Sequence, residues 1–353
     1  MMILDSILYN SDIERVTKSL NWLECKNNKT FFITGATGLI CSAVVDVLEY
    51  INVSRNLGWK IIIAVRNIDK AKERFQKYEI YSNLSLFKYD LTDDFEIPDN
   101  VDYIIHGAAN AFPAIFSAYP VETLTGCING LKHILDYTVI HKDTRVLYIS
   151  SSEVYGILHN DEAIKENECG IIDILSPRSC YSIGKQAAET LCTSFVSEYN
   201  SDCVIVRPGH IYGPTASEKD NRVSSLFMYS AAKGQDLVMK SNGEQLSSYC
   251  YCLDCASAII VSLFLGKKGE AYNISNRNSI CTIKEMAICY AKVANVKVIY
   301  DEPVTNEKLS FNPMLNSSLN SEKIERHGWK SVFSKEEGFY HSVLICKDLI
   351  EKY

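Results

Sequence analysis

A tyrosine and a lysine stand four positions apart in Tyr181-Ser-Ile-Gly-Lys185, near the start of a predicted helix over residues 179–199. This spacing places both side chains on one face of the helix. An ammonium group beside a phenol favours the phenolate, so we expect Lys185 to lower the pKa of Tyr181 below its usual value of about 10. Such a tyrosine can move a proton to or from a sugar hydroxyl while a nicotinamide carries the hydride.

A second polar cluster, Ser150-Ser-Ser-Glu153, ends an apolar run that predicts a strand over residues 145–150. Open α/β sheets bind their ligands beyond the carboxyl ends of the strands. We therefore expect this polar cluster to lie at the ligand site, together with Tyr181 and Lys185. The simpler interpretation of Glu153 is a strand-end carboxylate that faces water.

A glycine loop, Gly35-Ala-Thr-Gly38, lies between a predicted strand and a predicted helix over residues 39–51. Gly35 permits a tight turn, and Gly38 lets the backbone approach a pyrophosphate at the helix N-terminus. Cys41 replaces the third glycine of the usual pattern, and it is still small enough for the helix to pack on the strand. The motif predicts a dinucleotide-binding loop, with a structural turn as the alternative.

Arg66 follows the second predicted strand, where an NAD site normally has Asp or Glu for the ribose 2′-hydroxyl. A guanidinium suits a 2′-phosphate, so we expect NADP as cofactor, with NAD as the alternative. A solvated surface arginine is the simpler interpretation. The other expected cofactor contacts are Thr37, Leu39 and Ile40 in the first motif, then Asp90, Leu91, Ala108, Ala109, Pro208 and His210 after later strands.

Apolar runs alternate with helical patterns along the first two thirds of the chain, which predicts βαβ units and a parallel sheet. The runs are continuously apolar, as expected where helices cover both faces of the sheet. The expected fold is α/β, a Rossmann-type doubly wound parallel sheet with a smaller mixed α/β substrate-binding lobe at the C-terminal end. The expected division is a helical leader over 1–28, a nucleotide-binding domain over 29–207 and the smaller lobe over 208–353, with some C-terminal segments allowed to pack back on the first domain.

Composition narrows the classes of partner. The chain has 353 residues and a formal net charge of −7, which argues against a nucleic-acid or anionic-membrane partner. Its longest apolar stretch, Ala256–Leu265, is far shorter than the roughly 18 residues of a membrane span. The N-terminus lacks the pattern of a secretory signal. Thirteen scattered cysteines indicate free thiols in a reducing cytoplasm, and Cys250, Cys252 and Cys255 predict a core strand rather than a metal site.

Together the motifs resemble those of the extended short-chain dehydrogenase/reductase (NAD-dependent epimerase/dehydratase) family of nucleotide-sugar enzymes, over nearly the whole chain. The resemblance is strongest to the UDP-glucuronate decarboxylase-like branch. It rests on Tyr119-Pro-Val-Glu-Thr123, Ser152-Glu-Val-Tyr-Gly156, Cys180-Tyr181 with Gly184-Lys185, Ala188-Glu-Thr-Leu191 and Asp220-Asn-Arg-Val223. It implies a redox group of Ser151, Tyr181 and Lys185, a nucleotide-diphosphate sugar as substrate, and a homodimer. The implied substrate contacts are Ser152, His210, Arg222 and Tyr249.

Glu153 bears on the reaction type. In the family, enzymes that follow C4 oxidation with loss of CO2 or water generally carry Glu at this position, because a 4-keto group acidifies the C5 proton. We therefore expect decarboxylase-like or 4,6-dehydratase-like chemistry, in surface polysaccharide synthesis. An NADPH-dependent 4-ketoreductase or an epimerase is the alternative, and a non-catalytic NADP-binding regulator is more remote.

Several positions depart from the decarboxylase pattern. Ser182 and Ile183 replace an Asp-Glu pair, and His210 stands where Asn is common. The Arg expected before the aromatic strand is replaced around Ser247 and Ser248. These departures put UDP-glucuronate itself in doubt and leave the redox motif intact.

Overall fold

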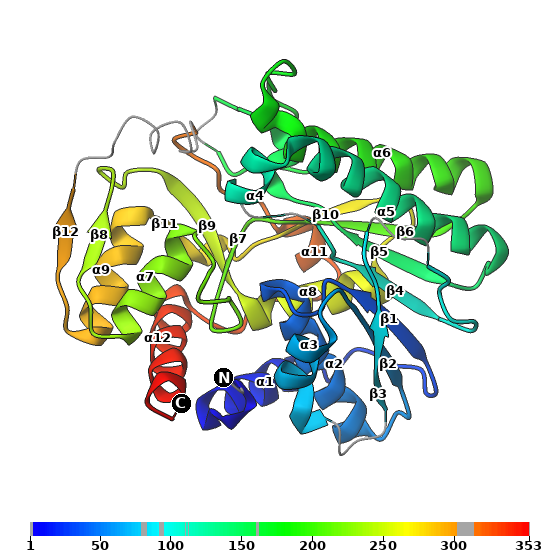
Figure 1. Cartoon of the computed structure of the whole chain (residues 1–353), viewed down its shortest axis with the longest axis horizontal. Coiled ribbons are helices and arrows are strands. Elements are labelled where there is room, and N and C mark those ends of the chain that lie inside the picture. The colour runs from blue at the N-terminus through cyan, green and yellow to red at the C-terminus, as the bar shows by residue number, and fades with distance from the viewer. Residues whose placement is uncertain are drawn as a thin grey trace.

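The computed structural model describes residues 3–78, 83–91, 95–109, 111, 113–159, 162–301 and 314–352. Its largest element is a sheet of seven strands in the order β10-β6-β5-β4-β1-β2-β3, in which every pair of neighbours is parallel (Figure 1). This arrangement confirms the predicted doubly wound sheet. The strands are β1 (Thr30–Thr34), β2 (Lys60–Val65), β3 (Leu84–Lys88), β4 (Tyr103–His106), β5 (Arg145–Ile149), β6 (Asp202–Pro208) and β10 (Ala271–Ile274).

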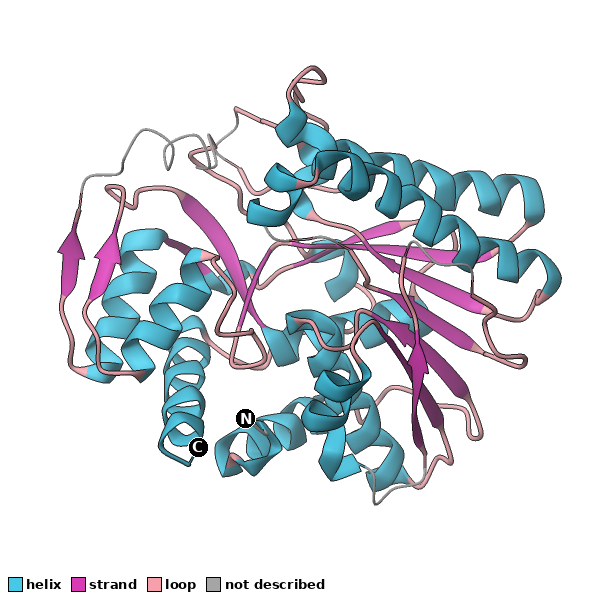
Figure 2. Cartoon of the chain, in the orientation of Figure 1, coloured by secondary structure: helices cyan, strands magenta, loops and turns pink. Residues whose placement is uncertain are grey.

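Helices cover both faces of this sheet (Figure 2). Successive side chains of a strand point to opposite faces, so Phe31 and Ile33 join one apolar core while Phe32 joins the other. The first core is closed by α2 and α8, which pack together, and the second by α5 and α6. These helices are α2 (Leu39–Arg55), α8 (Cys252–Leu265), α5 (Pro120–Ile140) and α6 (Cys180–Tyr199), with the shorter α3 (Ile68–Phe75) and α4 (Pro113–Ala118) nearby.

The second lobe is smaller and mixed. One of its sheets has the order β11-β9-β7 and the other pairs β12 with β8. The strands are β7 (His210–Tyr212), β8 (Leu237–Met239), β9 (Leu246–Tyr251), β11 (Ile280–Thr282) and β12 (Val298–Tyr300). The helices are α7 (Val223–Ala232), α9 (Ile283–Ala294) and α12 (Lys335–Lys352), with α11 (Glu322–Glu325) beside β10. The division at residue 208 remains a prediction, because β10 lies after it yet completes the large sheet.

The predicted helical leader contains α1 (Ile7–Ser19), which begins after Ser6, whose hydroxyl caps the helix by accepting from the Tyr9 amide. This helix joins the two lobes. The Tyr9 hydroxyl donates to Asp46 of α2 at 2.7 Å, and Asp12 accepts from Tyr251 of β9 at 3.0 Å. The leader is therefore an integral part of the packing.

All 13 cysteines are free. Cys250, Cys252 and Cys255 are buried, as predicted, but the prediction of one strand is wrong, since Cys252 and Cys255 lie on α8. Within the described residues, no group of three or more His, Cys, Asp or Glu side chains is placed to hold a metal ion. No helix in the described part of the chain is long and apolar enough to cross a membrane.

Candidate active site

The first turn of α6 brings Tyr181 and Lys185 to the carboxyl end of β5. Lys185 is buried, and its Nζ donates to the Ile149 carbonyl at 2.7 Å. The same nitrogen lies 5.9 Å from the centroid of the Tyr181 ring. Close packing of α6 on α5 depends on Gly184, because a Cβ there would lie 3.3 Å from Cys127. Gly184 thus lets α6 lie close to α5, which fixes how deeply Tyr181 and Lys185 are buried.

The predicted lowering of the Tyr181 pKa is wrong. Burial raises the pKa of the Tyr181 phenol well above its usual value, and the nearby Glu153 carboxylate raises it further. A hydrogen bond with Ser151 and the charge of Arg222 act in the opposite direction. Burial also lowers the pKa of Lys185, since desolvation disfavours its charge. Burial therefore disfavours the charged forms of both Tyr181 and Lys185.

Glu153 lies on a short 3-10 helix, Ser152–Tyr155, that follows β5. Arg178 donates to both of its carboxylate oxygens, at 2.9 and 3.2 Å, and the Ser182 hydroxyl donates to Oε2 at 3.1 Å. Two-point pairing of this kind fixes the direction of a carboxylate as well as its charge. The Glu153 carboxylate is held beside Tyr181 by these partners, although its side chain is still 36% exposed.

Arg178 also joins a stack of flat groups. Its guanidinium lies 4.6 Å from the centroid of the Phe116 ring, within the usual range for a cation–π contact. Phe116 stacks in turn on Tyr181, with ring centroids 5.2 Å apart and planes 16° apart. One arginine therefore contacts the acid directly and the catalytic phenol through an aromatic ring.

The two serines before Glu153, Ser151 and Ser152, have different contacts. The Ser151 hydroxyl accepts from the Glu153 amide at 3.2 Å and also bonds the Tyr181 phenol, so it touches both predicted catalytic groups. Ser152, the predicted substrate contact, begins the 3-10 helix and is partly buried. The structure thus brings Ser151, Glu153, Tyr181 and Lys185 together at one end of the sheet.

The second lobe contributes two of the predicted substrate residues to this place. Arg222 precedes α7, pairs with the buried Asp220, and acts electrostatically on Tyr181 and His210. Burial lowers the pKa of the His210 imidazole on β7 to about 4, and the Glu153 carboxylate acts in the opposite direction. Tyr249 pairs with His210 across β7 and β9 and is buried, its ring 5.6 Å from the imidazole. It forms part of the wall behind His210.

The glycine loop has the geometry that a pyrophosphate needs. Gly35 has a φ of +70°, and a Cβ there would lie 2.7 Å from the Gly107 backbone. Gly38 caps α2 without a side-chain hydrogen bond, and no acidic residue lies in the first turn. The amides of that turn are therefore open to an anion, which the helix dipole also favours. The residues present fit a dinucleotide, and Thr37, Leu39 and Ile40 lie in or next to this turn.

Cys41 contacts a glycine of the neighbouring strand's loop. A Cβ on Gly107 would lie only 2.3 Å from the Cys41 sulfur. The cysteine that replaces the third glycine of the motif therefore fits because the residue facing it, Gly107, has no side chain. Burial raises the pKa of the Cys41 thiol to about 12, which leaves it an inert packing group.

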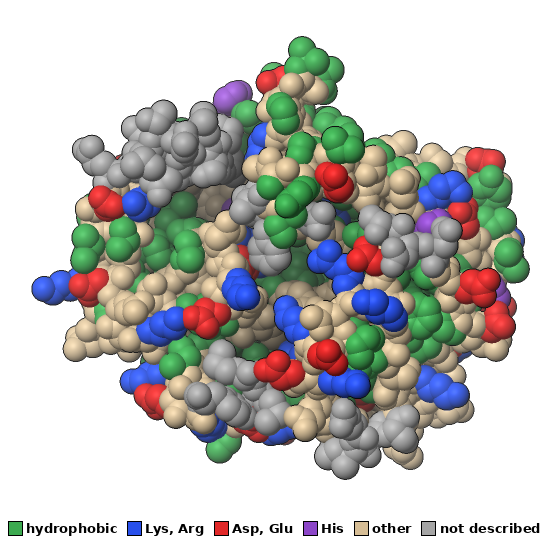
Figure 3. Space-filling view, in the orientation of Figure 1, with side chains coloured by type: hydrophobic (Ala, Val, Ile, Leu, Met, Phe, Trp, Pro, Cys, Tyr) green, Lys and Arg blue, Asp and Glu red, His purple; other side chains and the backbone are tan. Residues whose placement is uncertain are grey.

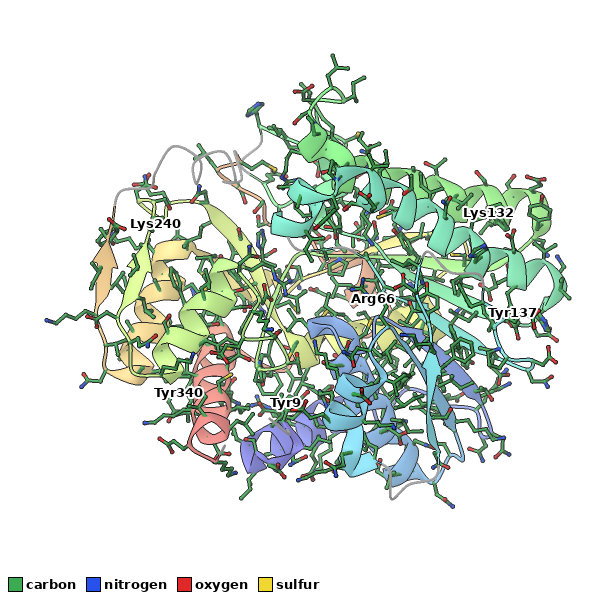
Figure 4. The ribbon with its side chains drawn as sticks, viewed as in Figure 1. Tyr9, Arg66, Lys132, Tyr137, Lys240 and Tyr340 are labelled. Atoms are coloured by element: carbon green, nitrogen blue, oxygen red, sulfur yellow. The ribbon has the colours of Figure 1, made fainter. Side chains whose placement is uncertain are left out.

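The remaining predicted cofactor residues lie at the ends of neighbouring strands. Arg66 follows β2, is exposed, and lies toward the middle of the molecule (Figure 4). The Ala108 amide donates to the Thr34 hydroxyl at 3.2 Å, which ties the loop after β4 to the loop after β1. Figure 3 shows a hollow near the middle of the face in view, with Lys and Arg side chains around its rim. Asp90 and Leu91 follow β3, Ala109 follows β4, and Pro208 ends β6.

Sequence reasoning missed several residues that shape the site: Thr34, His106, Phe116, Arg178, Ser182 as a ligand of Glu153, and Ser317. Arg178 carried one signal, since it lies three residues before Tyr181 in Pro177-Arg-Ser179. His106 and Ser317 carried none, because their partners are far away in the chain.

The chain is similar to known proteins over most of its length. Residues 31–275 match the model of the NAD dependent epimerase/dehydratase family. UDP-glucuronic acid decarboxylase 3 of Arabidopsis thaliana is 29% identical over 285 residues, which cover 79% of this chain and 80% of that protein. The dTDP-glucose 4,6-dehydratase of Bacillus anthracis, solved in complex with NAD, has a TM-score of 0.76 at 19% identity and covers 92% of this chain and 98% of its own.

A UDP-glucuronic acid 4-epimerase from Bacillus cereus, solved in complex with UDP-glucuronic acid and NAD, has the same fold, with a TM-score of 0.75 at 19% identity. The match covers 91% of this chain and 99% of that one. Relatives and structural neighbours thus include decarboxylases, dehydratases and epimerases of nucleotide sugars. The family match spans well over half of the chain, and this protein belongs to the NAD dependent epimerase/dehydratase family.

Proposed function

We propose that this protein oxidises a nucleotide-activated sugar at C4 and then acts at C5 of the resulting ketone, as a lyase of the decarboxylase or 4,6-dehydratase type. The observation that carries the proposal is the pairing of two groups with different tasks. Tyr181 can exchange a proton with the C4 hydroxyl, and Glu153 stands beside it as a carboxylate held by Arg178 and Ser182. Ser151 touches both groups and can keep them in register.

A nicotinamide bound at the glycine loop would take up the C4 hydrogen with its electron pair and later return it. This chain's residues perform the proton steps. Lys185 holds the end of β5 through the Ile149 carbonyl, and its Nζ lies 5.9 Å from the centroid of the Tyr181 ring. With a ketone at C4, a dehydratase would lose the acidic C5 proton to Glu153 while the C6 hydroxyl leaves as water. A decarboxylase would instead break the C5–C6 bond with loss of CO2 and gain a proton at C5, which Glu153 could help to deliver. Arg222 pairs with Asp220 on the second lobe, and we propose from the family resemblance that it contacts the diphosphate of the substrate.

For the cofactor, we propose NADP, with NAD as the alternative. Arg66 follows β2 and is exposed, so its guanidinium is available to a 2′-phosphate. Relatives solved with NAD support the alternative. The purified protein, denatured and analysed for bound nucleotide, distinguishes the two.

A second candidate function is an NADPH-dependent 4-ketoreductase or an epimerase, which Arg66 and the epimerase structural neighbours favour. Mass spectrometry of the products formed from UDP-, GDP-, CDP- and dTDP-sugars distinguishes the lyase from the reductase. Loss of about 44 Da indicates decarboxylation, loss of about 18 Da dehydration, and a gain of about 2 Da reduction. Absence of reaction across the panel, with cofactor bound, contradicts enzyme function and favours a regulator.

We also propose a reducing compartment, a homodimer and a role in surface polysaccharide synthesis. The first is supported by the 13 free cysteines, of which most are buried. The second and third rest on resemblance to the family, and gel filtration with light scattering tests the dimer.

A further inference from the structure

A nearly buried ion pair joins β6 to α6, one turn of the helix beyond Lys185. Arg207 of β6 donates from Nε to both carboxylate oxygens of Glu189, at 3.0 and 3.2 Å, and from Nη2 to one of them at 2.6 Å. The two side chains are 15% and 11% exposed, and pairing through two nitrogens fixes the angle between the partners as well as their distance. Glu189 lies one turn after Lys185 on the same face of α6, and its charge raises the pKa of Lys185 against the effect of burial. The pair therefore bears on both the position and the charge of this lysine.

The same arginine holds the short 3-10 helix that carries Glu153. Arg207 Nη1 donates to the Tyr155 hydroxyl at 3.0 Å, and the guanidinium lies 4.9 Å from the centroid of the Tyr155 ring. Tyr155 is 1% exposed and ends the 3-10 helix, two residues after Glu153. Its hydroxyl donates in turn to Asn273 of β10 at 2.6 Å. Arg207 therefore holds Tyr155 in one direction, and with it the end of the helix on which Glu153 lies.

The network continues into β10 and into the chain around residue 165. Arg207 Nη1 also donates to the Glu166 carbonyl at 2.9 Å, and the Glu166 carboxylate accepts from the Asn273 amide at 2.9 Å. The side-chain amide of Asn273 donates to the carbonyls of Ile164 and Asn320 at 2.9 and 3.1 Å. Buried polar networks whose members are paired hold those members in one arrangement. Arg207 is the member that reaches the 3-10 helix, α6 and the Glu166 segment at once.

The large sheet does not need this network to hold β6 in place. Backbone pairing already joins β6 to β5 on one side and to β10 on the other. Direct hydrogen bonds between α6 and the 3-10 helix run from Gln186 to the Val154 carbonyl at 2.7 Å and from Ser182 to Glu153 at 3.1 Å. What Arg207 adds is a rigid connection of both elements to the same strand.

We propose that Arg207 is a positioning residue for the reaction, which fixes the 3-10 helix of Glu153 against α6 so that the groups acting at C4 and at C5 meet the same sugar. The branch through Tyr155 serves Glu153, and the branch through Glu189 serves Tyr181. This inference rests on the proposed function and gives a role in it to residues outside the predicted site.

The test measures two half-reactions in the full-length protein, with its dinucleotide and a sugar nucleotide that it turns over. Reduction of the dinucleotide, read at about 340 nm, reports oxidation at C4, and product analysis reports completion. Tyr155→Phe removes only the hydroxyl that Arg207 holds. We expect it to change the rate of reduction by less than about twofold and to lower product formation by about tenfold, so that reduced dinucleotide accumulates. Tyr272→Phe is the matched control, because this buried hydroxyl accepts from the Lys267 amide at 2.8 Å, outside the network.

Glu189→Gln keeps the shape of the side chain and removes the charge that pairs with Arg207. We expect it to slow reduction of the dinucleotide by about tenfold, because the helix that carries Tyr181 loses its anchor. Product formation then falls by the same factor, and no reduced dinucleotide accumulates. A loss of stability alone would not make Tyr155→Phe and Glu189→Gln slow different steps. The same proportion of reduced dinucleotide to product in these two variants overturns the inference.

Arg145 is the matched control for Arg207, because it pairs with Asp202 at 2.9 Å between the opposite ends of β5 and β6. Arg207→Met should lower kcat by about 10- to 100-fold with a smaller change in KM. Arg207→Lys should recover part of that loss, because it keeps the charge but cannot hold two partners in a fixed plane. Arg145→Met should lower the thermal unfolding midpoint and leave kcat per folded molecule unchanged.

Equal kcat values per folded molecule for Arg207→Met and Arg145→Met overturn the inference and leave the proposed function intact. If Arg207→Met does not fold, the comparison of Tyr155→Phe with Glu189→Gln decides. Absence of reaction between the wild-type protein and every sugar nucleotide of the panel contradicts the proposed function, and the inference with it.

Discussion

Arg178 donates to both carboxylate oxygens of Glu153, although the two residues lie 25 positions apart on different elements. The same arginine lies over Phe116, which stacks on Tyr181. One side chain therefore both anchors Glu153, the proposed base for the C5 proton, and contacts the ring that packs on Tyr181, which exchanges a proton with the C4 hydroxyl. Arg178 is therefore a positioning residue, and its loss should separate the two halves of the reaction.

Glu153→Gln should stop the reaction after oxidation. The amide keeps the shape of the side chain and removes the base, so the hydride step proceeds and the reduced cofactor accumulates. We expect product formation to fall by roughly 10²- to 10⁴-fold, the usual effect of losing a general base. Absorbance at about 340 nm and product analysis check this. Stoichiometric consumption of added NADPH with little effect of the substitution would support the reductase alternative instead.

Arg178→Met should resemble Glu153→Gln in a weaker form. The carboxylate loses its two-point anchor, and we expect product formation to fall by roughly 10- to 100-fold while cofactor reduction falls less. Arg178→Lys, which keeps charge without the bidentate contact, should lie between wild type and Arg178→Met. If both half-reactions fall equally, the arginine only supports the local fold.

Tyr181→Phe should abolish turnover and leave the fold and the bound cofactor in place. Only the group that exchanges a proton with the C4 hydroxyl is lost, so a fall of roughly 10²- to 10⁴-fold is expected. Steady-state kinetics measure the turnover, circular dichroism checks the fold, and cofactor content checks that the dinucleotide stays bound. Tyr199→Phe, at the exposed end of the same helix, is the control. Near-normal activity in Tyr181→Phe would remove α6 from the mechanism.

Arg66→Asp should move cofactor preference from NADP toward NAD. The substitution removes the cation for a 2′-phosphate and supplies an acceptor for a 2′-hydroxyl. We expect the ratio of the two dissociation constants to change by at least about tenfold, which corresponds to about 1.4 kcal/mol. Wild-type protein that binds NAD more tightly than NADP would show that Arg66 does not select the cofactor.

Gly107→Ala should destabilise the protein through Cys41. The added methyl carbon would lie 2.3 Å from the sulfur, and overpacking of this kind costs about 1–3 kcal/mol. Cys41→Gly in the same chain removes the sulfur and should recover part of that loss. Thermal unfolding of the two single variants and the double variant measures the coupling. Strictly additive effects would show that the two positions do not compensate for each other.

His106 should make part of the protein's stability depend on pH. Burial lowers the pKa of its imidazole to about 3, whereas an unfolded histidine titrates at about 6.5. Between these values the unfolded chain binds a proton that the folded chain does not, so stability falls as pH falls from about 6.5 toward 3. The slope is at most about 1.4 kcal/mol per pH unit. His106→Asn should remove this slope, and unfolding midpoints of both proteins at several pH values test it.

Local patterns in the sequence determined much of this protein. The alternation of apolar runs and helices predicted the parallel sheet, and two short motifs identified the glycine loop and the Tyr181–Lys185 pair. These features depend on neighbours within a few residues, so spacing alone shows them. The resemblance to the epimerase/dehydratase family, confirmed by the family match, rests on the same short segments.

Only the tertiary structure decided which groups act on one another. The Arg178–Glu153 pair, the contact of Cys41 with Gly107, and the links from Arg207 to Glu189 and Tyr155 each join elements that are distant in the chain. The sequence also could not show how deeply each side chain is buried. Burial raises the pKa of Tyr181, which spacing had predicted to fall, because charging a phenol away from water is costly.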